Sequence, residues 1–482
     1  MSDGDEVANC DYSIFHASEF EVDVMSLVDL SPSLSLRKRA ISAGAWNLGA
    51  LVTSQGIRLG GNLIMARLLM PEMFGIMMIA TTVSVILHLL SDVGLRQNII
   101  QSPRGEDPAF LNTVWTVQIV RGLILFASTL LIAGIVWFAQ VFKVWPVDST
   151  YAVPELPLVL ALTGISALFY GLQSTKIDLA VRAFQQKKVV LTEFFSQLVG
   201  LLVMLVIGYF TRSVWSLVAA GLVAAMVSTL LGHVWFEGPS NRLQWERDAL
   251  KELVVFGRWI LLSSGVGVLA MYGDRILFGG SMTAAELGAY SIAVLILGAL
   301  QLAMQKVIGA VALPTFSEAS RVNDIPRMQS LYFRFKTMFD LACLFVCGLF
   351  FTGSPLLISI LYDERYAQAG EMMAILSLSF FTMRYMLAHQ VWIALGHTKY
   401  QAMDNIIRVV SLWVLLPLLL AIGGVKYAIW GAALYTFPTL ILVFYVNYRL
   451  GIFSLKRELA VLPMLAVGAL CGELLTGLAQ WL

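Results

Sequence analysis

Residues 66–101 read ARLLMPEMFGIMMIATTVSVILHLLSDVGLRQNIIQ, and the middle of this stretch decides the fold. From residue 73 to residue 91, 19 residues follow one another without an Asp, Glu, Lys or Arg, and most of them are apolar. A helix needs about 20 apolar residues to cross the ~30 Å hydrocarbon core of a bilayer. This segment is therefore predicted to span a membrane as a helix.

The rest of the chain has the same character. Hydrophobic residues make up 58% of the 482 residues, charged residues make up 13%, and the mean hydropathy is +0.79. Soluble domains carry about 25% charged residues, so a soluble fold could not bury this much apolar surface. The apolar runs are too long for the strands of a membrane barrel and lack their strict alternation. We therefore predict an all-α polytopic membrane protein.

Thirteen apolar runs qualify as candidate spans. They lie at about 40–66, 73–95, 110–142, 156–180, 189–210, 213–235, 257–280, 287–315, 333–362, 370–395, 403–423, 425–448 and 459–482. With the N-terminus placed in the cytoplasm, 22 of the 32 Lys and Arg residues fall in cytoplasmic connections and 5 in outer ones, and the others lie within spans. Short cytoplasmic loops carry an excess of Lys and Arg. This asymmetry predicts a cytoplasmic N-terminus and supports the list of spans.

The chain is predicted to consist of two six-helix lobes around a central cavity, plus one extra C-terminal helix. Residues 1–30 hold eight acidic residues and no Lys or Arg, which is typical of a disordered tail. The longest polar connection of the membrane region follows the sixth span. The predicted parts are a tail (1–35), an N-lobe (36–235), a cytoplasmic linker (236–256), a C-lobe (257–450) and an extra span (451–482).

Both predicted lobes begin with a similar outer turn. In each, an acidic residue precedes a Gly, and an Ala follows that Gly by five positions, at Gly75 and Ala80 in the first lobe and at Gly288 and Ala293 in the second. Gly permits a tight backbone in a turn. The repeated turn indicates a duplicated transporter, and a chance resemblance between apolar helices is the alternative.

Ionisable residues inside spans are costly and indicate a cavity or a buried partner. Asn47, Arg58 and Asn62 fall on one face of the first span, which favours a wet cavity over interhelical packing. Gln118 and Arg121 repeat this pattern in the third span. Lys306 and Arg384 would add cations from the second lobe, and a positive cavity at the lobe interface suits a pyrophosphate.

The sequence offers few groups for other chemistry. If a proton or Na⁺ drives transport, the candidate carboxylates are Asp92, Glu193 and Asp340, although each could also serve as a pairing or capping group. The histidines lack metal-ligand spacing, and no Gly-rich phosphate loop is present, so we predict no metal, cofactor or ATP hydrolysis. A net charge of +1 gives no argument for nucleic-acid binding.

Three stretches together resemble the Wzx-type polysaccharide flippases, which belong to a superfamily shared with multidrug antiporters and lipid II flippases. They are residues 66–101, GDRILFGGSMTAAELGAYSIA (273–293) and LYDERYAQAGEMMAIL (361–376). The resemblance implies a transporter, not an enzyme, that moves undecaprenyl-pyrophosphate-linked oligosaccharide across the bacterial inner membrane. It also implies work alongside a polysaccharide polymerase and other assembly proteins.

Three other functions stay open at this point. A lipid II flippase would also suit a cationic cavity, and a multidrug antiporter would need an anionic one. A membrane polysaccharide polymerase would need a large outer loop, and the longest outer loop here is about 143–155.

Overall fold

The computed structural model describes residues 34–322 and 324–481, and within these ranges the chain forms helices and connections but no β-strand. Side chains are not described for residues 34–45, 47, 48, 256, 258–264, 266, 310 and 480. The predicted acidic tail lies almost entirely outside the described residues. The chain divides into two compact units between Ser42 and Ala43, and the account below concerns the second unit.

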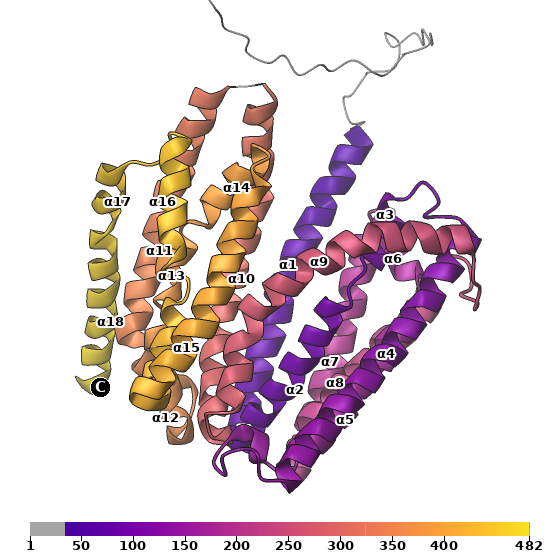
Figure 1. Cartoon of the computed structure of the whole chain (residues 1–482), viewed down its shortest axis with the longest axis horizontal. Helices are drawn as coiled ribbons and strands as arrows, with labels where there is room; N and C mark the ends of the chain where they lie inside the picture. Colours follow the sequence, from indigo (N-terminus) through magenta and orange to yellow (C-terminus); the bar gives the residue numbers. More distant parts are fainter. Residues whose placement is uncertain (1–33, 323, 482) are drawn as a thin grey trace, which may run out of the picture. The chain divides into compact units, whose positions relative to one another are not determined.

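The helices follow one another with short connections (Figure 1). Those of the first half are α1 (Leu34–Leu68), α2 (Pro71–Leu90), α3 (Leu95–Gln101), α4 (Pro108–Val141), the 3₁₀-helix η2 (Thr150–Ala152), α5 (Leu156–Leu172), α6 (Lys176–Arg182), α7 (Gln186–Thr211) and α8 (Trp215–Val234). Those of the second half are α9 (Arg247–Gly279), α10 (Ala284–Arg321), α11 (Ile325–Leu361), the 3₁₀-helix η3 (Glu364–Tyr366), α12 (Ala367–Leu376), α13 (Ser379–Met383), α14 (Met386–Ala394), α15 (Thr398–Leu434), α16 (Thr439–Arg449), α17 (Leu455–Val461) and α18 (Pro463–Trp481).

The protein is a multi-pass membrane protein. Among the described residues, eight helices are long and apolar enough to cross a bilayer, or nine if the bent pair α5 and α6 forms one span. Within the described residues, every predicted span coincides with helical structure. The tenth consists of α12, α13 and α14. The non-helical backbone of Gly423 and Gly424 divides α15 at the point where the eleventh and twelfth predicted spans meet. Helix α1, which carries the predicted polar stripe, is not among the eight.

Most helices pack within their own half of the chain. In the first half, α4 packs along α5, α7 along α8, and α5 also contacts α2 and α8 (Figure 1). In the second half, α11 packs against α12 and α18, and α10 against α12 and α14. Helix α2 contacts α9 and α10, which links the two sets. These contacts agree with two lobes, and the lobe organisation stays a prediction.

Helix α9 begins at Arg247, inside the predicted linker 236–256. The second part of that linker is helical because Ala249 and Leu253, one turn apart, share an apolar face. Both are buried against residues of α3 and α4, including Leu95 and Phe110. The second part of the predicted linker is therefore the start of α9.

The two similar outer turns lie next to each other. The prediction that Gly75 and Gly288 lie in the turns is wrong. Each lies one helical turn inside its helix, Gly75 in α2 and Gly288 in α10. A Cβ atom added at Gly288 would lie 1.8 Å from the carbonyl oxygen of Pro71, and one added at Gly75 would lie 2.0 Å from the carbonyl oxygen of Ala284. Both glycines are therefore required for the close crossing of two helix backbones. We call this contact the glycine crossing.

Other contacts join the two halves of the chain near the glycine crossing. Arg365 of η3 donates to the carbonyl oxygens of Ala66 and Arg67 at 3.2 and 3.4 Å, where it caps the C-terminal end of α1. The hydroxyl of Thr150 in η2 donates to the carbonyl of Met282 at 3.0 Å. The predicted orientation assigns this end of the protein to the outer side.

The last helix, α18, packs along α11 through glycines on both helices (Figure 1). A Cβ atom at Gly468 would lie 2.2 Å from the carbonyl oxygen of Phe345, and one at Gly348 would lie 2.1 Å from that of Leu465. Small residues let helix backbones approach closely in a membrane, where burial of apolar surface does not drive helix association. The extra C-terminal helix is thus docked on the second half.

We expect Gly468→Val to lower the thermal unfolding midpoint of the detergent-purified protein by several degrees, because the new side chain would push α18 away from α11. Gly477→Val is the matched control, since Gly477 lies on the same helix with no atom within 4 Å of an added Cβ. Equal midpoints for the two variants would contradict this account of the docking.

Candidate functional site

A cavity of about 810 Å³ lies among the helices of the first half. Its walls come from α2 to α8, and we call it the N-half cavity. Its charged or titratable lining residues are His88, Asp92, Arg96, Arg121, Tyr170, Asp178 and Glu193. Neutral polar side chains line the rest of the wall together with apolar ones. Such a wall would be unstable against lipid, so the cavity is suited to water or a polar ligand.

Arg121, a predicted substrate-binding residue, lines the N-half cavity from α4. Its Nε donates to the hydroxyl of Ser91 at 3.0 Å, and its Nη2 donates to the carbonyl of His88 at 2.7 Å. His88 lies in the last turn of α2, where carbonyl groups lack helical partners. Part of the guanidinium is thus used to hold the end of α2.

Gln118 lies one turn before Arg121 and also lines the cavity. Its amide nitrogen donates to the carbonyls of Tyr170 and Gln173 at 2.8 and 2.9 Å, at the end of α5. The two predicted residues of α4 are therefore brought together, and both fix the ends of neighbouring helices. Their roles toward substrate stay predictions.

Two of the three predicted coupling carboxylates, Asp92 and Glu193, line the same cavity. A third carboxylate there, Asp178 of α6, pairs with Arg96 of α3 at 3.5 Å. The cavity thus holds two arginines and three carboxylates. The sequence predicts a positive cavity between the lobes, whereas this cavity lies within the first half and carries mixed charge.

Other predicted substrate-binding residues lie away from the N-half cavity. Arg58 is exposed on α1, and the Asn62 amide donates to the Arg58 carbonyl at 2.7 Å on the same helix. Lys306 is exposed on α10. The side chain of Asn47 lies outside the described residues. Among described residues, no group of three or more His, Cys, Asp or Glu side chains is arranged to hold a metal ion.

Arg384 and Asp340, the remaining predicted residues, meet in a buried ionic cluster in the second half. Arg384 is 3% exposed; its guanidinium lies 3.7 Å from the Asp340 carboxylate and 3.0 Å from that of Glu458. Lys336 bonds to Asp340 at 2.6 Å and to Glu458 at 3.1 Å, and the Tyr385 hydroxyl donates to Glu458 at 2.8 Å. Two cations thus balance two anions among α11, α17 and the segment between α13 and α14.

Several of these residues carry little signal in the sequence. Arg96, Asp178 and Glu458 lie at the ends of apolar runs, where charges usually face water or headgroups. Lys336 lies one helical turn before Asp340, and this i, i+4 spacing is a sequence feature that indicates an ion pair. The partners of Arg96 and Arg384 are distant in sequence, and only the fold brings them together.

A segment that we call the strap, residues 241–246, runs from the first half to α9 across the start of α4. The backbone N–H groups of alternate residues Arg242, Gln244 and Glu246 donate to side chains of α4 at 3.0, 3.0 and 3.1 Å. The acceptors are the side-chain oxygens of Asn112, Thr116 and Thr113. Alternate donors on one side are typical of an extended chain. A polar face of α4 therefore acts as the partner of this extended segment.

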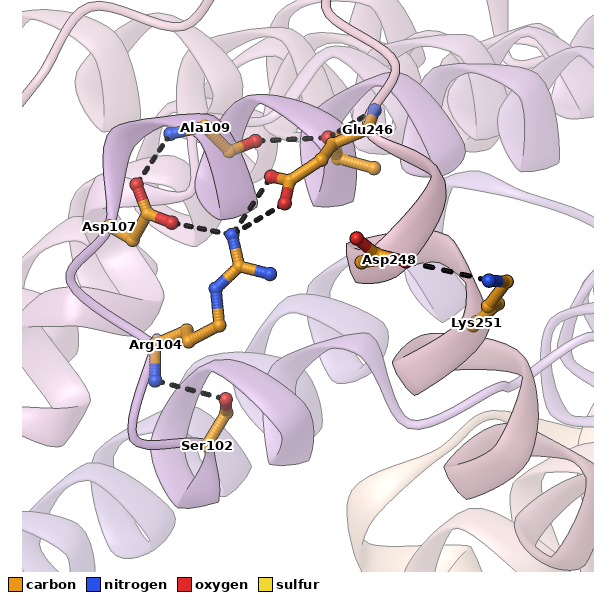
Figure 2. Close-up of polar contacts among 8 residues, drawn as sticks. Ser102, Arg104, Asp107, Ala109, Glu246, Asp248 and Lys251 are labelled. Atoms are coloured by element: carbon orange, nitrogen blue, oxygen red, sulfur yellow. Dashed lines mark hydrogen bonds and ion pairs between the residues drawn. The ribbon is translucent and has the colours of Figure 1, made fainter.

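Arg104 clamps the end of the strap, as Figure 2 shows. Its Nη2 lies 2.8 Å from Glu246 Oε1 and 2.6 Å from Asp107 Oδ2. These hydrogen bonds raise the pKa of Arg104 and lower the pKa of Asp107, which also accepts from the Ala109 N–H at 3.0 Å. At the strap's other end, Asn241 accepts from Ser174, the neighbour of the cavity residue Gln173. The strap thus connects α9 to elements that form the N-half cavity.

We expect Asp107→Asn to speed hydrogen exchange at the strap amides a few-fold at pH 7, after correction for intrinsic rates. The lowered pKa of Asp107 means that its ionised form stabilises the folded state. This contribution is present above the unfolded pKa of about 4 and is lost as the pH falls through the lower folded pKa. The difference between wild type and variant should therefore shrink below about pH 4 and vanish only below the lowered folded pKa of Asp107.

The matched control is Asp248→Asn, because Asp248 pairs with Lys251 at 3.5 Å on α9 and both side chains are exposed (Figure 2). Exposed pairs of this kind contribute little to stability. Indistinguishable exchange in Asp107→Asn, Asp248→Asn and wild type at pH 7 would contradict the clamp.

Comparisons with known proteins identify relatives of the chain. A family described as polysaccharide biosynthesis protein matches residues 64–371, more than half of the sequence. The amylovoran biosynthesis protein AmsL of Erwinia amylovora is 26% identical over 240 residues, which is 48% of this chain and 60% of that protein. The succinoglycan biosynthesis transport protein ExoT of Rhizobium meliloti (strain 1021) is 20% identical over 353 residues, which is 73% of this chain and 68% of that protein.

Solved structures share the fold. An inward-facing multidrug resistance MATE family transporter of the MOP superfamily aligns with a TM-score of 0.62 and 12% identity, over 84% of this chain and 94% of that one. The lipid II flippase MurJ in an inward closed conformation aligns with a TM-score of 0.62 and 11% identity, over 88% and 95%. At these identities the likeness concerns the fold alone.

Proposed function

Because the chain belongs to the polysaccharide biosynthesis protein family, we propose that it is a Wzx-type flippase of the MOP superfamily that flips a lipid-linked oligosaccharide across the bacterial inner membrane. The carrier would be undecaprenyl pyrophosphate, and the product would enter surface polysaccharide assembly, alongside a polymerase. The N-terminus would be cytoplasmic. The observation that carries the proposal is the polar N-half cavity within a bundle of membrane-spanning helices.

Alternating access of two lobes is the mechanism that fits best. The glycine crossing and the contacts of Arg365 and Thr150 hold the two halves together at the predicted outer end. At the opposite end, the strap ties the start of α9 to the first half. Transport would require the outer contacts to open while the covalent strap keeps the halves joined.

A coupling ion would act through groups in the N-half cavity. Asp92 and Glu193 face the same space as Arg121, so protonation of either carboxylate would change the charge of the cavity. Asp340 is held by Lys336 and Arg384 in the buried cluster and is the less suitable candidate. Exchange of one proton or Na⁺ per substrate would then shift the preference of the cavity for charged ligands.

A multidrug antiporter is the second candidate function. The three carboxylates of the N-half cavity favour it, because an organic cation would be attracted by them. Two arginines in the same cavity oppose it. A lipid II flippase is a third candidate, on fold alone.

Deletion in the source organism tests these functions against one another. A polysaccharide flippase predicts loss of surface polymer and accumulation of the lipid-linked unit on the cytoplasmic side, with unchanged drug resistance. Lost drug resistance with normal polymer would support the antiporter. Accumulation of unpolymerised units on the outer side would instead indicate a polymerase.

A further inference from the structure

We infer that the N-half cavity binds the uncharged sugar portion of the substrate and excludes the pyrophosphate, an inference that rests on the proposed function. The cavity wall offers mainly hydrogen-bond acceptors, and its charged side chains are of both signs. Sugar hydroxyls can donate to such acceptors, whereas a fully ionised pyrophosphate can only accept. The pyrophosphate would therefore lie elsewhere along the path.

Most hydroxyl groups of Ser and Thr in the wall already donate their hydrogen to the protein. Six of them donate to a main-chain carbonyl three or four residues earlier, at distances of 2.7 to 3.1 Å. They belong to Thr81, Ser84, Thr163, Ser166, Thr192 and Ser196, all of which line the cavity. A hydroxyl has one hydrogen and two lone pairs, so each of these presents lone pairs to a ligand.

Carboxylates add further acceptors to the same wall. Asp92, Asp178 and Glu193 can only accept when they are ionised. Asp178 is paired with Arg96 at 3.5 Å, which leaves Asp92 and Glu193 as the carboxylates without an arginine partner at salt-bridge distance. Two such carboxylates repel a phosphate and accept readily from the hydroxyls of a sugar ring.

Both arginines of the cavity lie against protein oxygens. Arg121 donates to Ser91 and to the His88 carbonyl, and Arg96 faces Asp178. A phosphate clamp requires an arginine fork that is free to bind two oxygens. Arg121 has two of its three nitrogens bound to protein oxygens, so it cannot present a complete fork. Arg96 lies beside the Asp178 carboxylate, which competes with a phosphate for its guanidinium.

The remaining lining residues also suit a sugar. The amide groups of Gln97 and Gln197 can both donate and accept, as sugar hydroxyls do. Tyr170 is 43% exposed, and its ring lies nearly perpendicular to that of His88. An exposed aromatic ring can pack against the C–H side of a pyranose. A volume of about 810 Å³ lies within the usual ~300–1,000 Å³ of small-molecule sites and admits a short oligosaccharide.

The direct test measures binding of two probes to the purified protein in detergent. One probe is the phosphate-free oligosaccharide released by mild acid from the host's lipid-linked precursor, and the other is inorganic pyrophosphate. We expect saturable binding of the oligosaccharide that pyrophosphate does not compete. Competition by pyrophosphate, or binding of tetraphenylphosphonium in place of the oligosaccharide, would overturn the inference.

Isosteric variants locate the site. Thr163→Val combined with Thr192→Val removes two cavity acceptors, at a cost of about tenfold in oligosaccharide affinity. Thr129→Val is the control, because Thr129 is a buried α4 residue with the same kind of hydrogen bond, to Leu125, but does not line the cavity. Unchanged affinity in the double variant would contradict the inference.

Transport in proteoliposomes separates this inference from the proposed function. The double variant should slow the flipping of the full lipid-linked oligosaccharide more than that of the same carrier with one sugar. Equal slowing of both lipids would contradict the sugar site but not the proposed flippase function. Failure of the wild type to move either lipid would reject the proposed function itself.

Discussion

Gly288→Ala should destabilise the protein by about 3 kcal/mol, whereas Gly298→Ala on the same helix should stabilise it by up to about 1 kcal/mol. At Gly288 the new methyl group would lie 1.8 Å from the Pro71 carbonyl oxygen, and no side-chain rotation could relieve that contact. At Gly298 an added Cβ meets no atom within 4 Å, so only the higher helix propensity of Ala remains. The same Gly→Ala change should therefore lower the stability of the protein at residue 288 and raise it at residue 298.

The buried thiols of Cys343 and Cys347 provide the measurement. A thiol-reactive fluorophore that labels them on unfolding reports the midpoint in detergent. Gly75→Ala should behave like Gly288→Ala, because a Cβ atom at Gly75 would lie 2.0 Å from the Ala284 carbonyl oxygen. Under the proposed mechanism both variants should also lose transport, since the outer end could no longer close. A Gly288→Ala protein with a wild-type midpoint would show that the glycine crossing is not a tight contact.

Arg384→Leu should be the most destabilising single change in the second half, at about 3–5 kcal/mol. Removal of this guanidinium leaves Asp340 and Glu458 with Lys336 as their sole cation within the buried cluster. An uncompensated buried charge is costly, while replacement of a whole ion pair by apolar groups is often neutral. The double variant Arg384→Leu with Glu458→Leu should therefore recover much of the lost stability, because Lys336 and Asp340 remain paired.

The same thermal assay compares the single and double variants. Arg408→Leu is a useful comparison, since Arg408 pairs with Asp404 at 2.7 Å but is itself about one-third exposed. If Arg384→Leu folded with a wild-type midpoint and lost only transport, Arg384 would bind substrate, as the sequence suggested, and the structural role would be wrong.

The helices were predictable because lipid leaves the backbone few options. A segment such as residues 73–91, without a charged residue, can satisfy its N–H and C=O groups in a bilayer as a helix. Helix α2 accordingly occupies Pro71–Leu90. Breaks inside spans were harder to predict. The boundary predicted between residues 423 and 425 coincides with non-helical backbone at Gly423 and Gly424, whereas the division of the tenth predicted span into α12, α13 and α14 was not predicted.

The candidate site was predictable only in part. Periodicity identified Gln118 and Arg121 as neighbours on one face of a helix, and the structure brings both to the N-half cavity with Asp92 and Glu193. Periodicity within one helix cannot say which helices meet. Arg384 therefore looked like a cavity cation, although Glu458, 74 positions later, lies within hydrogen-bonding distance.

The two repeated glycines, Gly75 and Gly288, are structurally required, but not for the turns that the sequence suggested. Its spacing suggested two similar turns, and a turn is the usual reason for a glycine. The need arises from the partner helix, since each glycine faces the backbone of the other half's helix. A single sequence does not contain that pairing.

The central claim is tested most directly with the purified protein in liposomes that carry the host's labelled lipid-linked oligosaccharide in both leaflets. A glycan-binding protein that cannot cross the membrane is added outside and captures what it can reach. The account predicts that empty liposomes release only the outer-leaflet fraction to the captor, whereas liposomes with this protein release nearly all of it. Capture that stops at the outer-leaflet fraction in both would contradict the proposal that this chain is a flippase.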